Sequence, residues 1–188
     1  MSTQYRKVWQ RSVSLITYTV IIIYILQLVV QLSRFIPLLQ NPIIVTPLYI
    51  VQLMLGVLFL LAFYDFRSIQ AKQDYPALHD MIASIYLWIG AVISIMLDWD
   101  IVAFCLQFTS IFSLIVGCNL LRNSSTFPDA AGAGAQKLWI GSLLSMVTWC
   151  VALLPLDLVG DIASCVMTLS VIFFVYRGWH EIYLAPKK

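Results

Sequence analysis

The sequence predicts an all-α integral membrane protein in which six helices form one bundle of three helical hairpins. Its 188 residues are 61% hydrophobic and only 11% charged, with a mean hydropathy of +0.91. A soluble domain carries about 25% charged and about 45–50% apolar residues, and a small domain cannot hide this much apolar surface from water. The apolar residues also fall in continuous runs close to the ~20 residues that a membrane-spanning helix requires. Strands of a membrane β-barrel would alternate instead.

Six apolar runs are the predicted spans, and together they make residues 1–188 a single transmembrane domain. They are residues 12–32, 46–64, 81–97, 101–121, 138–154 and 158–176. The first run is about twice as long as the apolar part of a secretory signal, and no small-residue cleavage site follows it, so it is predicted to be a retained span. Thr46 and Pro47 have the pattern of an N-cap followed by proline at the first helical position, which predicts the start of the second helix.

The connections between spans predict which helices are neighbours. The turns at residues 98–100 and 155–157 are so short that spans three and four, and spans five and six, must be antiparallel pairs. The segment 123–136 contains Ser-Ser-Thr and Ala-Ala-Gly-Ala-Gly-Ala, a low-complexity composition typical of a flexible loop.

Lysine and arginine are distributed unequally over the predicted loops. Ten of the eleven lie in the N-terminal segment, the second and fourth loops and the C-terminal tail, and Arg34 is the exception. Cytoplasmic loops of membrane proteins carry the excess of Lys and Arg, so both termini are predicted to be cytoplasmic. This basic face is expected to attract anionic lipid headgroups. A protein partner or a second copy of the chain remains an alternative, and nothing in the sequence points to nucleic acid.

The sequence lacks the residue arrangements that hydrolytic, metal-dependent or redox catalysis in a membrane requires. His79 and His180 fall outside the spans, so no histidine base is expected at membrane depth. Aspartyl catalysis needs two carboxylates within a few ångströms, whereas Asp65 and Asp161 are expected at opposite ends of the bundle. No motif for zinc, phosphate or redox chemistry is present. The sequence therefore predicts neither an enzyme nor a bound cofactor or metal.

Four cysteines fall within the spans, none of them at the spacing of a redox motif. Cys105, Cys118, Cys150 and Cys165 are expected to be small packing residues. Because Cys150 and Cys165 flank the fifth loop at comparable depth, a bridge between them stays open.

Two similar strings carry small residues four apart. Residues 87–95 (LWIGAVISI) and 138–146 (LWIGSLLSM) share five identities in nine, which leaves a duplicated hairpin as an open possibility. The pairs Gly90/Ser94 and Gly141/Ser145 are expected to let helices approach closely. Packing inside the bundle is preferred over a dimer face, because six helices offer many internal contacts.

Strongly polar side chains gather in the half of the spans away from the termini. Tyr24, Gln27, Gln31 and Arg34 follow a spacing of 3, 4 and 3 and so share one face of the first helix. No charged residue lies near the middle of a span, which argues against a proton relay, a voltage sensor or a charged midplane site. Further polar residues expected in this half are Gln52, Gln107, Asp98, Asp100, Asp157 and Asp161.

This polar set has two interpretations. It can form an outward-facing vestibule for water, a cation or a small polar ligand. Alternatively, the glutamines bridge helices, Asp100 and Asp157 cap the fourth and sixth helices, and Asp161 meets the positive end of the sixth helix dipole. The second interpretation is preferred, because helix starts account for most of the acids without a ligand, and it predicts a non-catalytic accessory or assembly subunit of the cytoplasmic membrane. The first favours a small transporter or channel.

Overall fold

The computed structural model describes residues 3–32, 35–36, 41–153 and 157–185, without the side chains of residues 3, 130, 152, 153, 157 and 158. Six α-helices and one short 3-10 helix account for nearly all of this chain, and the described residues contain no strand. In order, they are α1 (Thr3–Leu32), α2 (Pro42–Ser68), η2 (Lys72–Asp74), α3 (Tyr75–Met96), α4 (Asp100–Arg122), α5 (Asp129–Leu153) and α6 (Asp157–Leu184). The predicted all-α bundle is confirmed.

The outer surface of the bundle is apolar. Ile43, Ile101 and Val159 are 80%, 82% and 73% exposed, and many other large apolar side chains also face outward. Five of the helices (α1, α2, α3 with η2, α4 and α6) are long and apolar enough to cross a membrane. A soluble protein would bury such side chains, whereas lipid solvates them. The chain is a multi-pass membrane protein.

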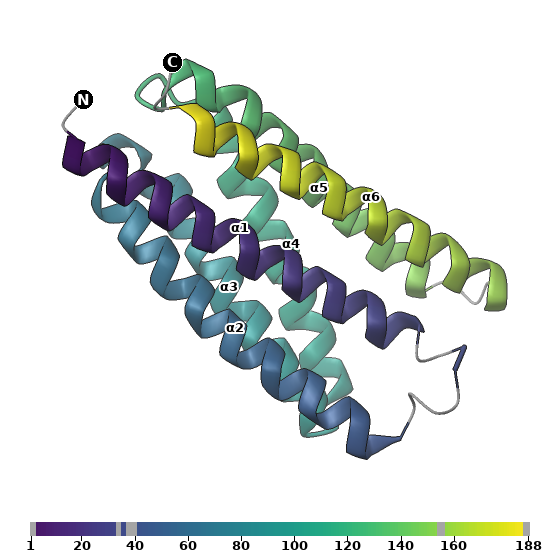
Figure 1. Ribbon diagram of the computed structural model, residues 1–188. Coiled ribbons are helices and arrows are strands. Elements are labelled where there is room, and N and C mark those ends of the chain that lie inside the picture. The colour runs from purple at the N-terminus through teal and green to yellow at the C-terminus, as the bar shows by residue number, and fades with distance from the viewer. Residues whose placement is uncertain (1–2, 33–34, 37–40, 154–156, 186–188) are drawn as a thin grey trace.

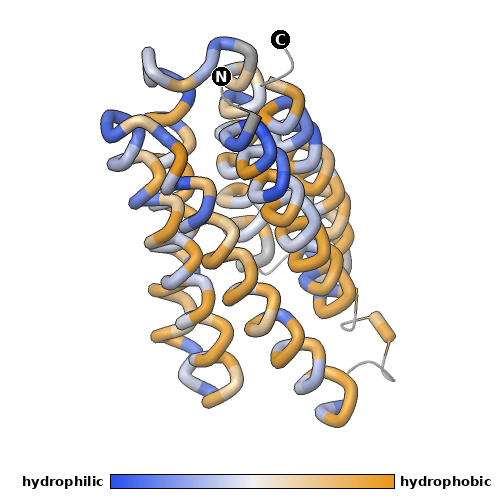
Figure 2. The backbone as a smooth tube through the Cα atoms, turned by 60° about the vertical axis from the view of Figure 1, so that its left-hand side comes forward, coloured by the Kyte–Doolittle hydropathy of each residue, from blue (hydrophilic) through white to orange (hydrophobic). Residues whose placement is uncertain are grey.

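The helices form a closed ring. Each helix packs against the next one in the sequence, and α6 packs against α1 to complete the circle. Both termini lie at the same end of the bundle, here named the terminal end, and the opposite end is the distal end (Figure 1). Trp9 of α1 donates a 2.9 Å hydrogen bond from Nε1 to the carbonyl oxygen of Ile182 of α6, 173 residues away. Hydrophilic residues concentrate toward the terminal end (Figure 2).

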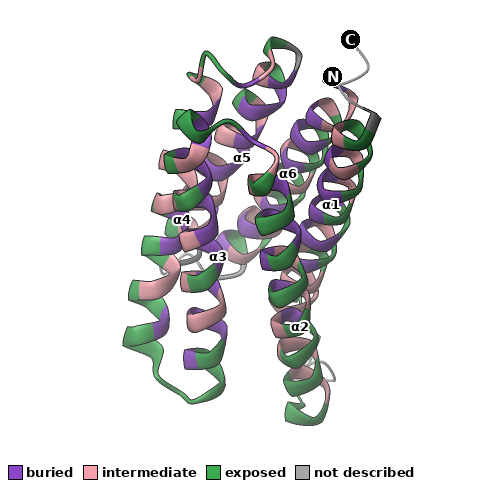
Figure 3. Ribbon diagram, turned by 90° about the vertical axis from the view of Figure 1, so that its left-hand side faces the viewer, coloured by how far each residue is buried: buried purple, intermediate pink, exposed green. Residues whose placement is uncertain are grey.

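Five aromatic side chains fill the core toward the terminal end, and we call them the aromatic floor. Each is at most 3% exposed, and they come from α1, α2, α6 and the α4–α5 loop: Trp9, Phe63, Phe66, Phe127 and Trp179. Trp9 meets Phe66 edge-on with ring centroids 5.1 Å apart, and Phe63 meets Trp179 edge-on at 5.5 Å. Edge-to-face pairs at these distances are favourable beyond the area that they bury. By contrast, the distal ends of α2 and α4 are largely exposed (Figure 3).

Helix α2 begins earlier than the sequence pattern predicted. Asn41 is its N-cap, accepting a 3.0 Å hydrogen bond on its side chain from the Ile43 amide, and Pro42 follows at the first helical position. The predicted start at Thr46 and Pro47 is therefore wrong, because Asn41–Pro42 has the same capping pattern a few residues earlier. Pro47 lies inside the helix, where membrane helices tolerate proline.

The segment 123–136 is not a loop throughout, because α5 begins at Asp129. Of its Ala and Gly residues, Ala131 and Ala135 are fully buried, and Gly134 packs against α6. A Cβ atom added to Gly134 would lie 2.5 Å from the Gly178 carbonyl oxygen, so the two backbones nearly touch. The predicted flexible loop is wrong for this part. The small residues that suggested low complexity allow close helix approach instead.

Candidate functional site

A cavity of about 310 Å³ occupies the centre of the ring and is lined by all six helices. Toward the terminal end it stops at Phe63 and Trp179 of the aromatic floor. Toward the distal end its wall reaches Gln31 and Ile95, which are the next-to-last residues of α1 and α3. The cavity is therefore closed at one end of the bundle and extends close to the helix ends at the other.

The cavity wall is mostly apolar, and its polar groups are neutral. The polar lining residues are Tyr24, Gln27, Gln31, Tyr49, Gln52, Ser84, Gln107, Ser110, Ser142, Ser145, Thr148 and Thr168, together with three tryptophans. Among the described residues, no Asp, Glu, Lys, Arg or His lines it. Ligand pockets commonly have this composition, with a few polar groups placed in an apolar wall.

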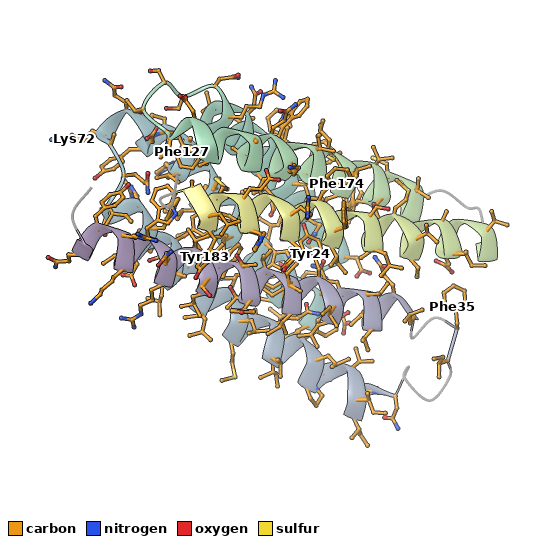
Figure 4. All side chains as sticks on the ribbon, turned by 45° about the horizontal axis from the view of Figure 1, so that its top comes forward. Tyr24, Phe35, Lys72, Phe127, Phe174 and Tyr183 are labelled. Carbon is orange, nitrogen blue, oxygen red and sulfur yellow. The ribbon has the colours of Figure 1, made fainter. Side chains whose placement is uncertain are left out.

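The structure brings together the uncharged members of the predicted polar set. Tyr24, Gln27, Gln31, Gln52 and Gln107 all line the cavity, although they come from three different helices. Figure 4 shows Tyr24 at mid-bundle, between Phe127 toward the terminal end and Phe35 beyond the distal end of α1.

The three charged members of the predicted set whose side chains are described do not line the cavity. Asp98 and Asp100 are exposed at the α3–α4 turn, and Asp161 is half-buried on α6. Arg34 and the Asp157 side chain lie outside the described residues, so the expected pairing of Arg34 with an aspartate is not part of the described structure.

Asp100 does not cap α4. The N-cap is Trp99, which makes no side-chain capping bond, and Asp100 is the first residue of the helix. The expected cap is therefore wrong by one position. Asp98, directly before, has φ 56° and makes the sharp turn that shifts the helix start. In the first turn, Asp100 still places a negative charge near the positive end of the helix dipole.

Some of the lining residues bridge helices. The Tyr24 hydroxyl lies 3.2 Å from Ser145 Oγ and so joins α1 to α5, although these helices are not neighbours in the ring. The Thr168 hydroxyl of α6 lies 3.1 Å from Gln31 Oε1 of α1, to which it can donate. These contacts give Tyr24 and Gln31 a structural role, which the second interpretation of the sequence anticipated.

Several hydroxyls in the wall use their hydrogen within their own helix. Ser142, Ser145 and Thr148 of α5 lie within 2.7–3.1 Å of the carbonyl oxygens of Trp139, Gly141 and Leu144, to which they donate. The hydroxyl oxygens retain lone pairs and can still accept a hydrogen bond. The α5 wall therefore offers mainly hydrogen-bond acceptors to the cavity.

Gln52 differs from the other glutamines of the wall. Its side chain is 2% exposed, and its amide nitrogen Nε2 is buried with no hydrogen-bond partner. A buried polar group left without a partner costs about 1–3 kcal/mol. This donor is the clearest unmet hydrogen-bonding requirement in the cavity wall.

The predicted packing glycines face neighbouring helices of the same bundle. A Cβ atom on Gly90 would lie 3.2 Å from Leu106 Cδ1 of α4, and one on Gly141 would lie 3.3 Å from Phe174 Cβ of α6. Ser94 donates to the Gly90 carbonyl oxygen over 2.9 Å. Tighter contacts occur at glycines that sequence reasoning missed, among them Gly117, where a Cβ would lie 2.8 Å from the Ala77 carbonyl oxygen.

A buried carboxylate at the terminal end was also missed. Asp74 is 1% exposed and accepts hydrogen bonds on Oδ1 from the hydroxyls of Ser124 and Thr126, while its Oδ2 atom is buried without a partner. These bonds tie η2 to the α4–α5 loop. From the sequence, a loop aspartate two residues from a lysine is expected to be solvated, so no local signal marks it. Nearby, Lys137 and Glu181 form an ion pair between α5 and α6.

No disulfide joins Cys150 to Cys165, and all four cysteines carry thiols. The open question of a bridge at the fifth loop is therefore answered in the negative. Only Cys118 is fully buried, and it lies in the cavity wall.

The chain matches no protein family model, no curated protein and no solved structure. Its function must therefore be argued from the cavity itself.

Proposed function

We propose that the protein binds a small molecule inside the membrane and exchanges it with one side, as a small transporter or channel does. The observation that carries the proposal is the central cavity, which is lined by neutral polar groups from all six helices and closed at the terminal end by the aromatic floor.

The size of the cavity supports an occupant. Protein interiors are close-packed, with few voids larger than a water molecule. Side chains that face a space of 310 Å³ with no occupant would lose packing contacts on that side, which destabilises a fold. Packing polar side chains around an empty space adds to this cost. A cavity that regularly holds water or a ligand avoids both penalties.

The distribution of basic residues supports an orientation for this exchange. With ten of the eleven Lys and Arg residues in segments at the terminal end, that end would face the cytoplasm. The cavity would then be reached from the exterior. Exposed Arg6, Lys7, Arg11 and Arg177 at the terminal end would contact anionic lipid headgroups.

A cavity-filling experiment tests the proposal. Ser145→Phe on α5 and Val30→Phe on α1 place a large side chain in the cavity from two different helices. Val147→Phe, two residues from Ser145 and 48% exposed on the outer surface, makes a comparable change facing lipid. The purified proteins are screened by thermal melting in detergent against a panel of small neutral and charged solutes. We expect at least one solute to stabilise the wild type and Val147→Phe but neither cavity variant.

The accessory-subunit hypothesis predicts a different outcome. An accessory subunit would co-purify with a protein partner in mild detergent, and the cavity-filling variants would retain that partner. No solute would stabilise the wild-type protein. This combination of results would refute the proposed binding function.

A further inference from the structure

We infer that the ligand of the cavity is an uncharged amphipathic molecule whose polar end both donates and accepts hydrogen bonds, as an alcohol or a carboxamide does. Gln52 would donate to its acceptor atom. This inference rests on the proposed binding function and names the ligand class.

The absence of charge in the described wall argues against an ion as the preferred ligand. Neither a carboxylate nor a basic group lines the cavity, so a bound cation or anion would have no opposite charge beside it. Burying an unpaired charge is much more costly than burying a neutral polar group. The unpartnered group in the wall, the Gln52 amide nitrogen, is a hydrogen-bond donor and would repel a cation.

The hydrogen-bonding state of the wall defines the polar end of the ligand. Ser142, Ser145 and Thr148 direct their hydrogens to backbone carbonyl oxygens, so toward the cavity they can only accept. Ser145 already accepts from the Tyr24 hydroxyl, which leaves the Ser142 and Thr148 oxygens as acceptors for a donor on the ligand. Gln52 has an amide nitrogen without a partner and requires an acceptor. The nitrogen itself is buried in the wall, but Gln52 lines the cavity, so a half-turn of its terminal amide would bring the nitrogen toward a bound group. A hydroxyl or a carboxamide satisfies both requirements.

The remainder of the wall defines the apolar part of the ligand. Phe59 and Phe63 follow Gln52 on the same helix, about 10 Å and about 16 Å nearer the terminal end at ~1.5 Å rise per residue. Trp88 and Trp179 add further aromatic surface to the wall. A ligand held at Gln52 by its polar end would extend its hydrocarbon part toward the aromatic floor.

A series of probes with one hydrocarbon chain and different polar ends tests the ligand class. The probes are 1-hexanol, hexanamide, hexylammonium and hexanoate, measured at neutral pH by saturable thermal stabilisation of the full-length protein in detergent. The wild type is compared with Gln52→Met, which keeps the length of the side chain but removes the donor, and with Gln52→Leu as a second variant. Gln136→Met, at an exposed position of α5 outside the cavity, controls for probe that partitions into the detergent.

We expect hexanol and hexanamide to stabilise the wild type and Gln136→Met, and to bind both Gln52 variants at least tenfold more weakly. The charged probes should bind the wild type at least tenfold more weakly than hexanamide. Equal binding of a charged probe, or unchanged hexanamide binding by a folded Gln52 variant, would overturn the inference. If Ser145→Phe blocks that charged probe, the cavity still binds ligands and only the ligand class is wrong. If no probe binds the wild type, the ligand class inferred here is refuted, and the solute panel decides separately whether the cavity binds anything.

Discussion

The contact between Gly134 and Gly178 predicts opposite effects for two neighbouring glycine substitutions in α5. A Cβ atom on Gly134 would lie 2.5 Å from the Gly178 carbonyl oxygen and 3.1 Å from the Ile182 amide nitrogen, both of them backbone atoms that cannot rotate away. A Cβ atom on Gly132, two residues earlier, would meet nothing within 4 Å. The two glycines therefore lie in the same Ala-Gly segment of α5, but only Gly132 has room for a side chain.

The expected magnitudes follow from this geometry. Gly134→Ala must separate α5 from α6 by about 0.9 Å to reach the 3.4 Å of ordinary contact, and overpacking of this kind costs about 1–3 kcal/mol. Alanine gains about 0.5–1 kcal/mol over glycine in a helix. We therefore expect Gly134→Ala to lower the free energy of unfolding by about 1–2 kcal/mol. Gly132→Ala should raise it by about 0.5–1 kcal/mol.

The assay is reversible unfolding of the purified protein in mixed micelles of a mild and a denaturing detergent, followed by tryptophan fluorescence. Gly178→Ala, on the other side of the contact, should reproduce the effect of Gly134→Ala, because its Cβ would lie 2.8 Å from the Gly134 carbonyl oxygen. Equal unfolding free energies for Gly132→Ala and Gly134→Ala would show that the helices do not meet at this distance.

Three further predictions address the ring, the helix contacts and the orientation. Trp9→Phe removes the hydrogen bond to the Ile182 carbonyl oxygen and should lower the free energy of unfolding by about 1 kcal/mol, measured in the same assay. Gly90→Leu and Gly141→Leu should both lower the melting temperature in detergent, and unchanged melting would mean that these glycines face lipid. Ser125→Cys, in a background without the four native cysteines, should react with an impermeant reagent only after cells are permeabilised; labelling of intact cells would reverse the proposed orientation.

The sequence predicts the helical bundle well because the constraint that lipid imposes acts locally. Each span needs its own apolar run, and glutamines within a span are costly to expose to lipid, so the inward direction of Gln27 and Gln31 follows from their spacing. The predicted polar set also contains the aspartates, because the position of a residue in the sequence indicates its depth along the bundle but not whether its side chain faces the cavity. Asp98 and Asp100 follow Ile95 of the cavity wall by only three and five residues, and yet both are exposed at the α3–α4 turn and do not line the cavity.

Features that depend on contacts between distant segments could not be predicted. Two Xaa-Pro pairs near the start of α2 carry similar capping signals, and sequence does not show which one the bundle uses. The Ala-Gly segment reads as a flexible loop until α6 supplies Gly178 as its partner. The unpartnered donor of Gln52 is likewise a property of the assembled wall. From the sequence around it, residue 52 is only another glutamine in a membrane span.

The closed ring also has a consequence for how the protein is made. Its last contact joins α6 to α1, so the first helix enters the membrane long before its partner has been synthesised. During that interval Gln31 lacks Thr168, and the Trp9 side chain lacks the Ile182 carbonyl oxygen. Polar groups on the inner face of α1 must therefore be shielded from lipid by the insertion machinery or by water until translation reaches α6. A nascent chain that stops before α6 keeps an open ring, with the polar groups of α1 that α6 would cover left exposed.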